Sequence, residues 1–258
     1  QPYAPTGKLW MQWPDGLFVC SASVIDKGVI VTAAHCVVDF GTGATPTSIW
    51  FEPARNGNST PFGSFDVSNW VYATSYANGS DVCDPQAPGV VCENDWALAT
   101  VEPNGSGQYI ESVIGGSYGV EDGDFGYVSF SGEMAAQITQ LGYPVSLDGG
   151  NRMIRTDSLG TQSTPNQVVI GSDQTGGSSG GPWLANFGIS PSSSGNPVPT
   201  DSTSNRVIGT TSWGYVDPSV DVQGASRFGN NTAFPAPGPT NIEAGINQVC
   251  TNYPAYCN

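Results

Sequence analysis

The amino-acid sequence predicts an all-β fold of many short antiparallel strands, arranged as a sandwich or a barrel. Short runs of β-branched and aromatic residues recur along the 258 residues, and turn-forming residues separate them. Strands do not alternate with helical patterns, as they would in a parallel sheet. Only one stretch has a convincing helical pattern, and it lies near the C-terminus.

The strand-like runs are short and are bounded by turn signals. In chain order they comprise residues 17–20, 24–32, 49–51, 96–101, 138–143, 168–170 and 207–213. The turn signals are Pro-Asp-Gly at 14–16, Asn-Gly at 56–57 and 78–79, and Asp-Gly-Gly at 148–150. This spacing is typical of antiparallel hairpins.

The helix is expected to begin at a capping box. Thr240 is followed three residues later by Glu243, and Ile242, Ile246 and Val249 then recur on one helical face. Ahead of it, residues 190–205 are rich in Pro, Ser and Asn, and we expect them to form a long surface loop.

The charge balance excludes several classes of partner. The chain has 7 Lys and Arg against 22 Asp and Glu, for a formal net charge of -15. So few basic residues cannot form the positive stripe that phosphate binding requires, so we expect no nucleic-acid partner and no anionic membrane partner. No apolar run approaches the roughly 18 residues of a membrane-spanning helix.

The cysteines and the single histidine restrict the chemistry further. His35 is the only imidazole, so a His-rich zinc site is excluded and we expect no metal and no cofactor. Six Cys without a Cys-x-x-Cys pair indicate disulfides formed in an oxidising compartment. We therefore expect a secreted, extracellular protein. Its Gln-Pro start fits a mature form from which targeting segments have been removed.

The strongest local motif is the Gly- and Ser-rich segment 175–182, Thr-Gly-Gly-Ser-Ser-Gly-Gly-Pro. Alone it also fits a flexible loop, but such a turn lets backbone N–H groups converge beside an exposed, nucleophilic Ser. It formally contains Gly-x-Ser-x-Gly, the nucleophile elbow of α/β-hydrolases. That fold requires the order Ser, acid, His, whereas His35 precedes these serines, so the elbow is rejected.

Two further segments carry candidate catalytic side chains. His35 ends a β-branched run and is next to Cys36, which would immobilise it as a general base requires. Asp95 opens an apolar strand that would partly bury its carboxylate. Taken singly, a lone His is more often structural and an Asp at a strand start usually caps a turn. Together the segments give the order His35, Asp95, Ser179.

At this point the sequence resembles the chymotrypsin-like serine proteases. Their signatures match Thr-Ala-Ala-His-Cys at 32–36, Asn-Asp-Trp-Ala-Leu at 94–98 and Gly-Ser-Ser-Gly-Gly-Pro at 177–182. Ser212-Trp213-Gly214 resembles the segment that pairs with extended substrate, and the matches run from about residue 8 to residue 249. The sequence is most similar to secreted microbial members of the V8-like, glutamyl-endopeptidase-like branch.

The resemblance implies a fold of two six-stranded antiparallel β-barrels with a C-terminal helix. Residues 1–118 would form the N-terminal barrel carrying His35 and Asp95. Residues 119–258 would form the second barrel carrying Ser179, together with the helix. The Gly- and Asp-rich stretch 115–126 is the candidate connection between the barrels.

The resemblance also implies roles for individual residues. Ser179 would be the nucleophile, because it and not Ser178 fits the motif, with His35 as general base and Asp95 orienting the imidazole. The backbone N–H groups of Gly177 and Ser179 would form the oxyanion hole. Substrate-binding residues would be Asp173, Ser212, Trp213 and Gly214, and the expected disulfides are Cys20–Cys36, Cys83–Cys92 and Cys250–Cys257.

Two departures from the family pattern matter. Ser178 stands where animal digestive members carry the Asp that pairs with a new N-terminal amine, so that activation switch is expected to be absent. Glutamyl endopeptidases place a second His in the pocket for the residue before the scissile bond (P1), and the corresponding position beside Trp213 is Ser212. Asp173 lies where trypsin-like members bind Arg or Lys, although a turn Asp in a different register is equally compatible.

We therefore predict a secreted serine endopeptidase, an enzyme that hydrolyses peptide bonds through an acyl-enzyme, with a slight preference for a basic P1 residue. Its partners would be protein or peptide substrates, and we expect a monomer. The alternatives are glutamyl-type or broad specificity, an esterase with the same triad, and a catalytically silent, protease-like secreted binding protein.

Overall fold

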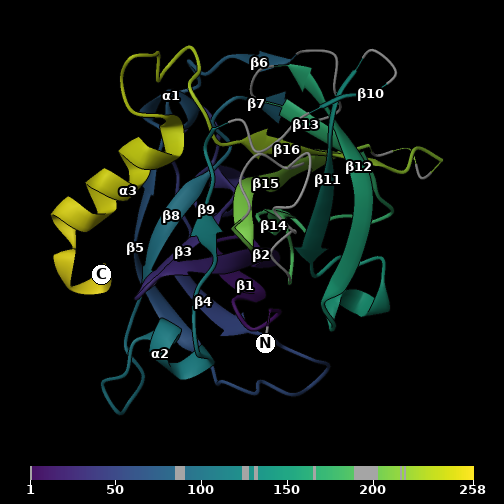
Figure 1. Ribbon diagram of the computed structural model, residues 1–258. Coiled ribbons are helices and arrows are strands. Elements are labelled where there is room, and N and C mark those ends of the chain that lie inside the picture. The colour runs from purple at the N-terminus through teal and green to yellow at the C-terminus, as the bar shows by residue number, and fades with distance from the viewer. Residues whose placement is uncertain are drawn as a thin grey trace.

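The protein consists of two closed antiparallel barrels, each of six strands, seen side by side in the computed structural model (Figure 1). The structure describes residues 2–258 except 85–90, 124–127, 131–132, 165–166, 189–202, 216 and 218. The fold class predicted from the sequence is confirmed. The expected loop 190–205 lies mostly outside the described residues.

The first barrel closes because its first strand pairs with two neighbours. In spatial order its strands are β1 (Thr6–Trp13), β2 (Gly16–Asp26), β3 (Val29–Thr32), β8 (Ala97–Val101), β5 (Phe65–Tyr72) and β4 (Ser48–Pro53), and β4 returns to β1. Every residue of β3 and β8 is buried, in line with their apolar sequences. The run 24–32 was expected to be one strand and is instead the β2–β3 hairpin, because the chain turns at Lys27 and Gly28.

The second barrel closes through a pairing between β11 and β14. Its strands are β11 (Glu133–Gly142), β12 (Ile154–Thr164), β13 (Gln167–Gly171), β16 (Val222–Arg227), β15 (Arg206–Gly214) and β14 (Pro182–Ala185). The short strands β9 (Gly119–Val120) and β10 (Val128–Phe130) add to it, and β6 (Cys83–Asp84) pairs separately with β7 (Val91–Cys92).

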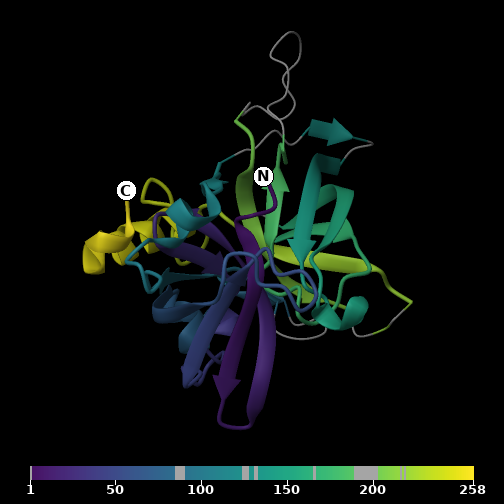
Figure 2. The same ribbon diagram turned by 90° about the horizontal axis from the view of Figure 1, so that it is seen from below.

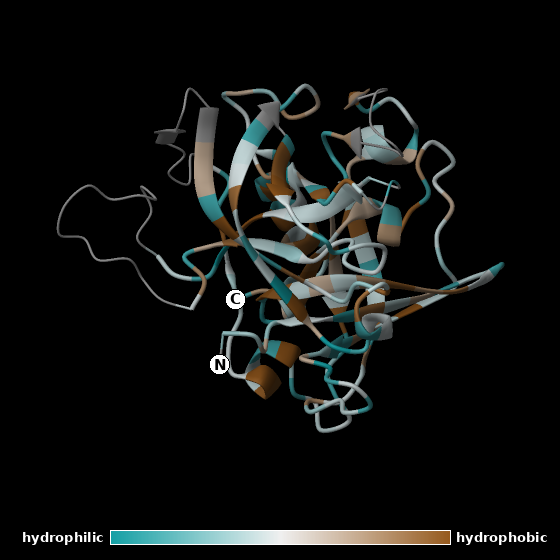
Figure 3. Ribbon diagram, turned by 90° about the vertical axis from the view of Figure 1, so that its right-hand side faces the viewer, coloured by the Kyte–Doolittle hydropathy of each residue, from teal (hydrophilic) through white to brown (hydrophobic). Residues whose placement is uncertain are grey.

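Part of the core of the second barrel is polar. Among the described residues, this barrel has a separate apolar cluster of Ala136, Ile138, Val168, Ile170, Trp183, Ala185, Ile208 and Ala225. Beside it, buried Gln140 donates hydrogen bonds from Nε2 to Thr211 Oγ1, at 3.1 Å, and to Gln223 Oε1. Because buried polar groups need partners, this network ties β11, β15 and β16 together inside the barrel. In Figure 3 the brown, apolar stretches lie mainly on strands.

The C-terminal helix α3 (Asn241–Asn252) has the predicted capping box. Thr240 Oγ1 accepts a hydrogen bond from Glu243 N at 3.3 Å, and Thr240 N donates to Glu243 Oε2 at 3.0 Å. The helix packs against β5 and β8 of the first barrel, although it follows the second barrel in sequence (Figure 1). The approach is close, because a Cβ at Gly245 would lie 2.5 Å from the Trp96 ring.

The remaining helices are short. They are α1 (Thr74–Ala77), α2 (Ile110–Ile114) and the 3-10 turns η1 (Ala34–Cys36), η2 (Asp148–Gly150) and η3 (Pro254–Tyr256). Within the described part of the chain, none of the helices has the length and apolar character needed to cross a membrane.

Candidate active site

The strand pairing brings His35 and Asp95 to the same edge of the first barrel. Strands β3 and β8 are antiparallel neighbours, with Thr32 opposite Ala97. His35 follows β3 by three residues, on η1, and Asp95 precedes β8 by two. Since the end of β3 lies beside the start of β8, two residues sixty positions apart in sequence meet at one edge.

Asp95 holds the imidazole of His35 in a defined orientation. His35 Nδ1 lies 2.8 Å from Asp95 Oδ2, and the backbone N of His35 donates to Asp95 Oδ1 at 2.9 Å. Ser212 Oγ donates a third hydrogen bond, to Asp95 Oδ2 at 2.5 Å. The Asp95 side chain is fully buried, whereas that of His35 is 35% exposed. This leaves the far side of the imidazole available to a reacting group.

The electrostatics of this pair favour a charged imidazole. Burial lowers the pKa of His35, but the charge of Asp95 and its hydrogen bond to Nδ1 outweigh burial and raise the pKa above its ordinary value. Asp95 can thus stabilise the imidazolium that forms when His35 accepts a proton.

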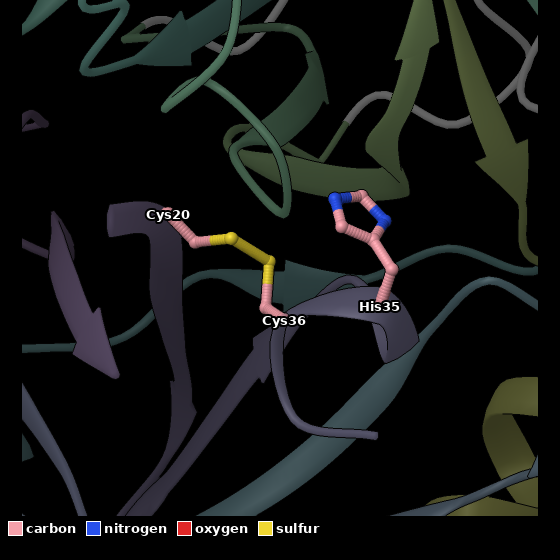
Figure 4. Close-up of side chains that lie close together, drawn as sticks. All are labelled: Cys20, His35 and Cys36. Atoms are coloured by element: carbon pink, nitrogen blue, oxygen red, sulfur yellow. A yellow bond between two sulfur atoms is a disulfide. The ribbon is translucent and has the colours of Figure 1, made fainter. Parts of the chain in front are cut away.

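A disulfide fixes η1 in place. Cys20 on β2 is bonded to Cys36, the residue after His35, and Figure 4 shows the imidazole beside that disulfide. The other expected pairs are also present: Cys83–Cys92 joins β6 to β7, and Cys250–Cys257 joins α3 to the segment after η3. The cysteines near His35 are therefore not available as metal-binding thiolates.

Ser179 lies in the tight turn that precedes β14, where Gly180 approaches the first barrel closely and Gly177 approaches Tyr143 of its own barrel. A Cβ at Gly180 would lie 2.0 Å from Thr32 Oγ1, and one at Gly177 would lie 2.5 Å from the carbonyl oxygen of Tyr143. Both glycines also have positive φ, at +75° and +97°. Ser179 and His35 line the same cavity of about 630 Å³.

The backbone around Ser179 leaves two N–H groups available. Among the described residues, no backbone carbonyl accepts a hydrogen bond from the N–H of Gly177 or of Ser179. The preceding carbonyl, of Gly176, accepts from Val145 N at 2.8 Å. Because a trans peptide directs its C=O and N–H to opposite sides, this bond turns the Gly177 N–H away from Val145.

Ser21 on β2 of the first barrel supports this turn, and the sequence did not single it out. Its hydroxyl donates to the carbonyl of Gly177 at 2.8 Å and accepts from Tyr143 N at 2.9 Å. Its own backbone N donates to the carbonyl of Ser179 at 2.7 Å. Ser21 is fully buried, so these bonds are shielded from water.

Ser178 is anchored within its own barrel. Its side chain is almost fully buried and donates to the carbonyl of Thr175 at 2.6 Å. Gln223 Nε2 lies 3.3 Å from Ser178 Oγ. Neutral hydrogen bonds therefore hold the position at which animal digestive members carry an ion-paired Asp.

A second cavity, of about 570 Å³, also opens beside Ser179. The structure brings all four predicted substrate-binding residues to its wall: Asp173, Ser212, Trp213 and Gly214. Asp217 and Asp221, which the sequence had not indicated, line it as well, and none of the described lining residues is basic. Asp173 is exposed rather than enclosed at the base of a pocket.

The fold is that of a chymotrypsin-like serine protease. The family described as Trypsin matches residues 10–225, and the chain belongs to this family. A trypsin of Saccharopolyspora erythraea is 28% identical over 211 residues, which cover 78% of each chain. A glutamyl endopeptidase of Bacillus licheniformis is 24% identical over 164 residues, covering 63% of this chain and 44% of the relative.

Solved structures share the fold. The protease Anisep from Arthrobacter nicotinovorans superposes with a TM-score of 0.68 at 24% identity, covering 90% of this chain and 96% of that one. A glutamyl endopeptidase superposes with a TM-score of 0.65 at 16% identity, covering 97% and 92%. The predicted likeness to microbial members of the family is confirmed.

Proposed function

We propose that this protein is a secreted serine endopeptidase that uses Ser179, His35 and Asp95 as a catalytic triad. The observation that carries the proposal is the buried Asp95 carboxylate, which has three hydrogen-bond partners, one of them His35 Nδ1, while His35 and Ser179 line one cavity. The likeness to two peptidases in sequence supports it.

In the proposed reaction Ser179 Oγ attacks the carbonyl carbon of the scissile bond while His35 accepts its proton. The negative charge that develops on the carbonyl oxygen is stabilised by the N–H groups of Gly177 and Ser179. His35 then donates the proton to the leaving amine, and water hydrolyses the acyl-enzyme by the same steps. Asp95 keeps Nδ1 protonated, so that the other ring nitrogen can act as the base.

A fluorophosphonate probe tests this proposal. We expect it to react covalently with Ser179 Oγ in the folded protein, because reaction requires both an activated hydroxyl and oxyanion donors. Peptide mass spectrometry locates the adduct. Ser179→Ala should abolish labelling, while Ser178→Ala should retain the adduct on Ser179. No adduct on folded protein, or an adduct on Ser178, would contradict the assignment and favour a catalytically silent binding protein.

We propose that the enzyme prefers substrates with a basic residue, Arg or Lys, at P1. Asp173, Asp217 and Asp221 all line the cavity beside Ser179, and a Glu side chain there would meet only like charges. Digestion of a peptide library should show cleavage after Arg or Lys, and Asp173→Asn should lower kcat/KM for these peptides about tenfold. Turnover of a substrate with a neutral P1 residue should not fall in this variant. Cleavage mainly after Glu would overturn the proposal.

The disulfides and the charge of the chain bear on where the protein acts and on its partners. Three disulfides support an extracellular location, and the net charge of -15 argues against nucleic-acid partners. We propose residues 1–118 and 119–258 as the two domains of a monomer. The helix α3 would then tie the end of the second domain to the first. Assay of esters beside peptides separates the endopeptidase from an esterase.

A further inference from the structure

Lys8 is a buried lysine at the junction of the two barrels. Its strand β1 contacts β11 of the second barrel, and in Figure 2 it lies in the purple hairpin beside that barrel. The residue is only 3% exposed, and among the described residues its ammonium group forms no ion pair. Burying a charge without a counter-ion is costly, so stability alone does not account for a lysine at this position.

The surroundings of Lys8 do not neutralise its charge. Glu52 is its cross-strand neighbour on β4, but Glu52 Oε2 accepts hydrogen bonds from Trp10 Nε1 at 2.9 Å and from Arg55 Nη1 at 2.5 Å. Burial and the nearby charge of Arg55 lower the pKa of Lys8, and the charge of Glu52 offsets this only in part. The Trp10 ring, whose centroid lies 4.3 Å from Nζ, covers one side of the ammonium.

The ammonium of Lys8 donates its one hydrogen bond among the described residues to the second barrel. Nζ lies 2.7 Å from the carbonyl oxygen of Gly150, 142 positions further along the chain. Gly150 ends η2 and belongs to residues 143–151, a segment of the connection between β11 and β12. It has a positive φ of +65°, and a Cβ there would lie 3.0 Å from the carbonyl oxygen of Tyr143, so Lys8 holds a tightly packed turn.

Further hydrogen bonds fasten both ends of this segment to the first barrel. Tyr143 Oη donates to the carbonyl of Arg55 at 3.0 Å. Gly57 N donates to the carbonyl of Asn151 at 2.8 Å. Of these donors only Lys8 carries a charge, and charged donors form the stronger hydrogen bonds. Lys8 is therefore expected to contribute most to holding the segment in place.

The same segment contacts the turn that carries the candidate nucleophile. Val145 N donates to the carbonyl of Gly176 at 2.8 Å. Ser146 N donates to Thr175 Oγ1 at 3.3 Å. The bond of Val145 sets the direction of the Gly177 N–H, because the C=O and N–H of one trans peptide point to opposite sides. A displaced segment would therefore displace a candidate oxyanion donor.

We propose that Lys8 is a positioning residue for the oxyanion hole: it holds residues 143–151 in the place from which Val145 orients the Gly177 N–H. The inference rests on the proposed endopeptidase function and deepens it. Lys8 lines neither of the two cavities beside Ser179. Its loss should therefore affect the chemical step rather than the binding of substrate.

Lys8→Met tests this inference, because Met keeps most of the apolar side chain and removes the donor. We expect kcat for a peptide substrate to fall about tenfold with little change in KM. A peptide trifluoromethyl ketone, whose adduct with Ser179 carries an oxyanion, should bind about tenfold more weakly. Lys27→Met is the matched control. Lys27 is the other lysine of the chain, and its Nζ also lies 4.3 Å from the centroid of an aromatic ring, that of Tyr109.

Amide hydrogen exchange gives a readout that needs no substrate. Residues 143–151 and 175–179 should exchange faster in Lys8→Met than in the wild type or in Lys27→Met. Tyr143→Phe is a second variant, which removes another hydrogen bond of the same segment without removing a charge. It should also lower kcat with little change in KM, and it tests the role of the segment if Lys8→Met does not fold.

The outcomes separate this inference from the proposed function. If the wild type cleaves no peptide, the endopeptidase proposal fails, whereas hydrogen exchange still tests whether Lys8 holds the segment. Wild-type kcat in folded Lys8→Met, an equal loss in Lys27→Met, a loss confined to KM, or unchanged exchange of residues 143–151 would overturn the positioning role.

Discussion

Asp95→Asn is expected to lower kcat by about 10⁴-fold while the protein remains folded. An Asn amide presents an NH₂ group where Asp95 now accepts bonds from His35 and Ser212, so the imidazole loses the partner that keeps Nδ1 protonated. The neutral amide also no longer stabilises the imidazolium. Peptide hydrolysis at saturating substrate, with thermal unfolding in parallel, measures the effect.

The pH profile adds a second readout for this variant. His35 must be neutral to accept a proton, so wild-type kcat/KM should fall as the pH drops through the pKa of His35, which Asp95 holds above 6.5. When the charge of Asp95 is removed, burial becomes the main influence on the pKa of His35, and burial lowers that pKa. The acid limb of the variant should therefore move to lower pH.

Asp66→Asn is the control for the loss of one negative charge. Asp66 lies on β5 of the same barrel, and its side chain is exposed. We expect the kcat of the Asp66→Asn variant, and the acid limb of its pH profile, to match those of the wild type. If Asp95→Asn retained wild-type kcat, or lost activity only because it unfolded, the role assigned to Asp95 would be wrong.

Ser21→Ala is expected to lower kcat about 10- to 100-fold with little change in KM, less than the loss of a whole oxyanion donor. The variant leaves the Gly177 carbonyl and the Tyr143 N–H without their shared hydroxyl. Two buried groups without a partner favour a rearranged turn, so the N–H groups of Gly177 and Ser179 would no longer converge. The ground-state contacts of the substrate in the Asp173 cavity would remain.

Ser23→Ala provides a closely matched control. Ser23 lies two residues further along β2, is also fully buried, and its hydroxyl has no partner among the described residues. Its removal should leave kcat, KM and the unfolding temperature close to wild type. Equal kcat losses in both variants, or a Ser21→Ala defect confined to KM, would rule out the positioning role of Ser21.

The motifs could be found in the sequence because each one depends on residues that are adjacent in the chain. The turn around Ser179 needs contiguous small residues, and the segments 32–36 and 94–98 each join one functional side chain to an apolar strand. A capping box is equally local, so the start of α3 was predictable at Thr240. The prediction of one strand over residues 24–32 was wrong, because a single Gly-containing turn between two apolar strands is a weak sequence signal.

The all-β class, the family, the C-terminal helix and the candidate site residues could be predicted from the sequence, because each depends on residues adjacent in the chain or on the order of motifs. The contact of Ser21 with Gly177, the position of Phe18 rather than Leu17 on the cavity of His35, and the packing of α3 on the first barrel became evident from the three-dimensional structure. These contacts arise where the two barrels dock or where strand register selects a face. Ser21 and Gly177 are 156 positions apart in the sequence. A contact between residues so distant produces no local or periodic sequence pattern, so it could not be predicted from the sequence.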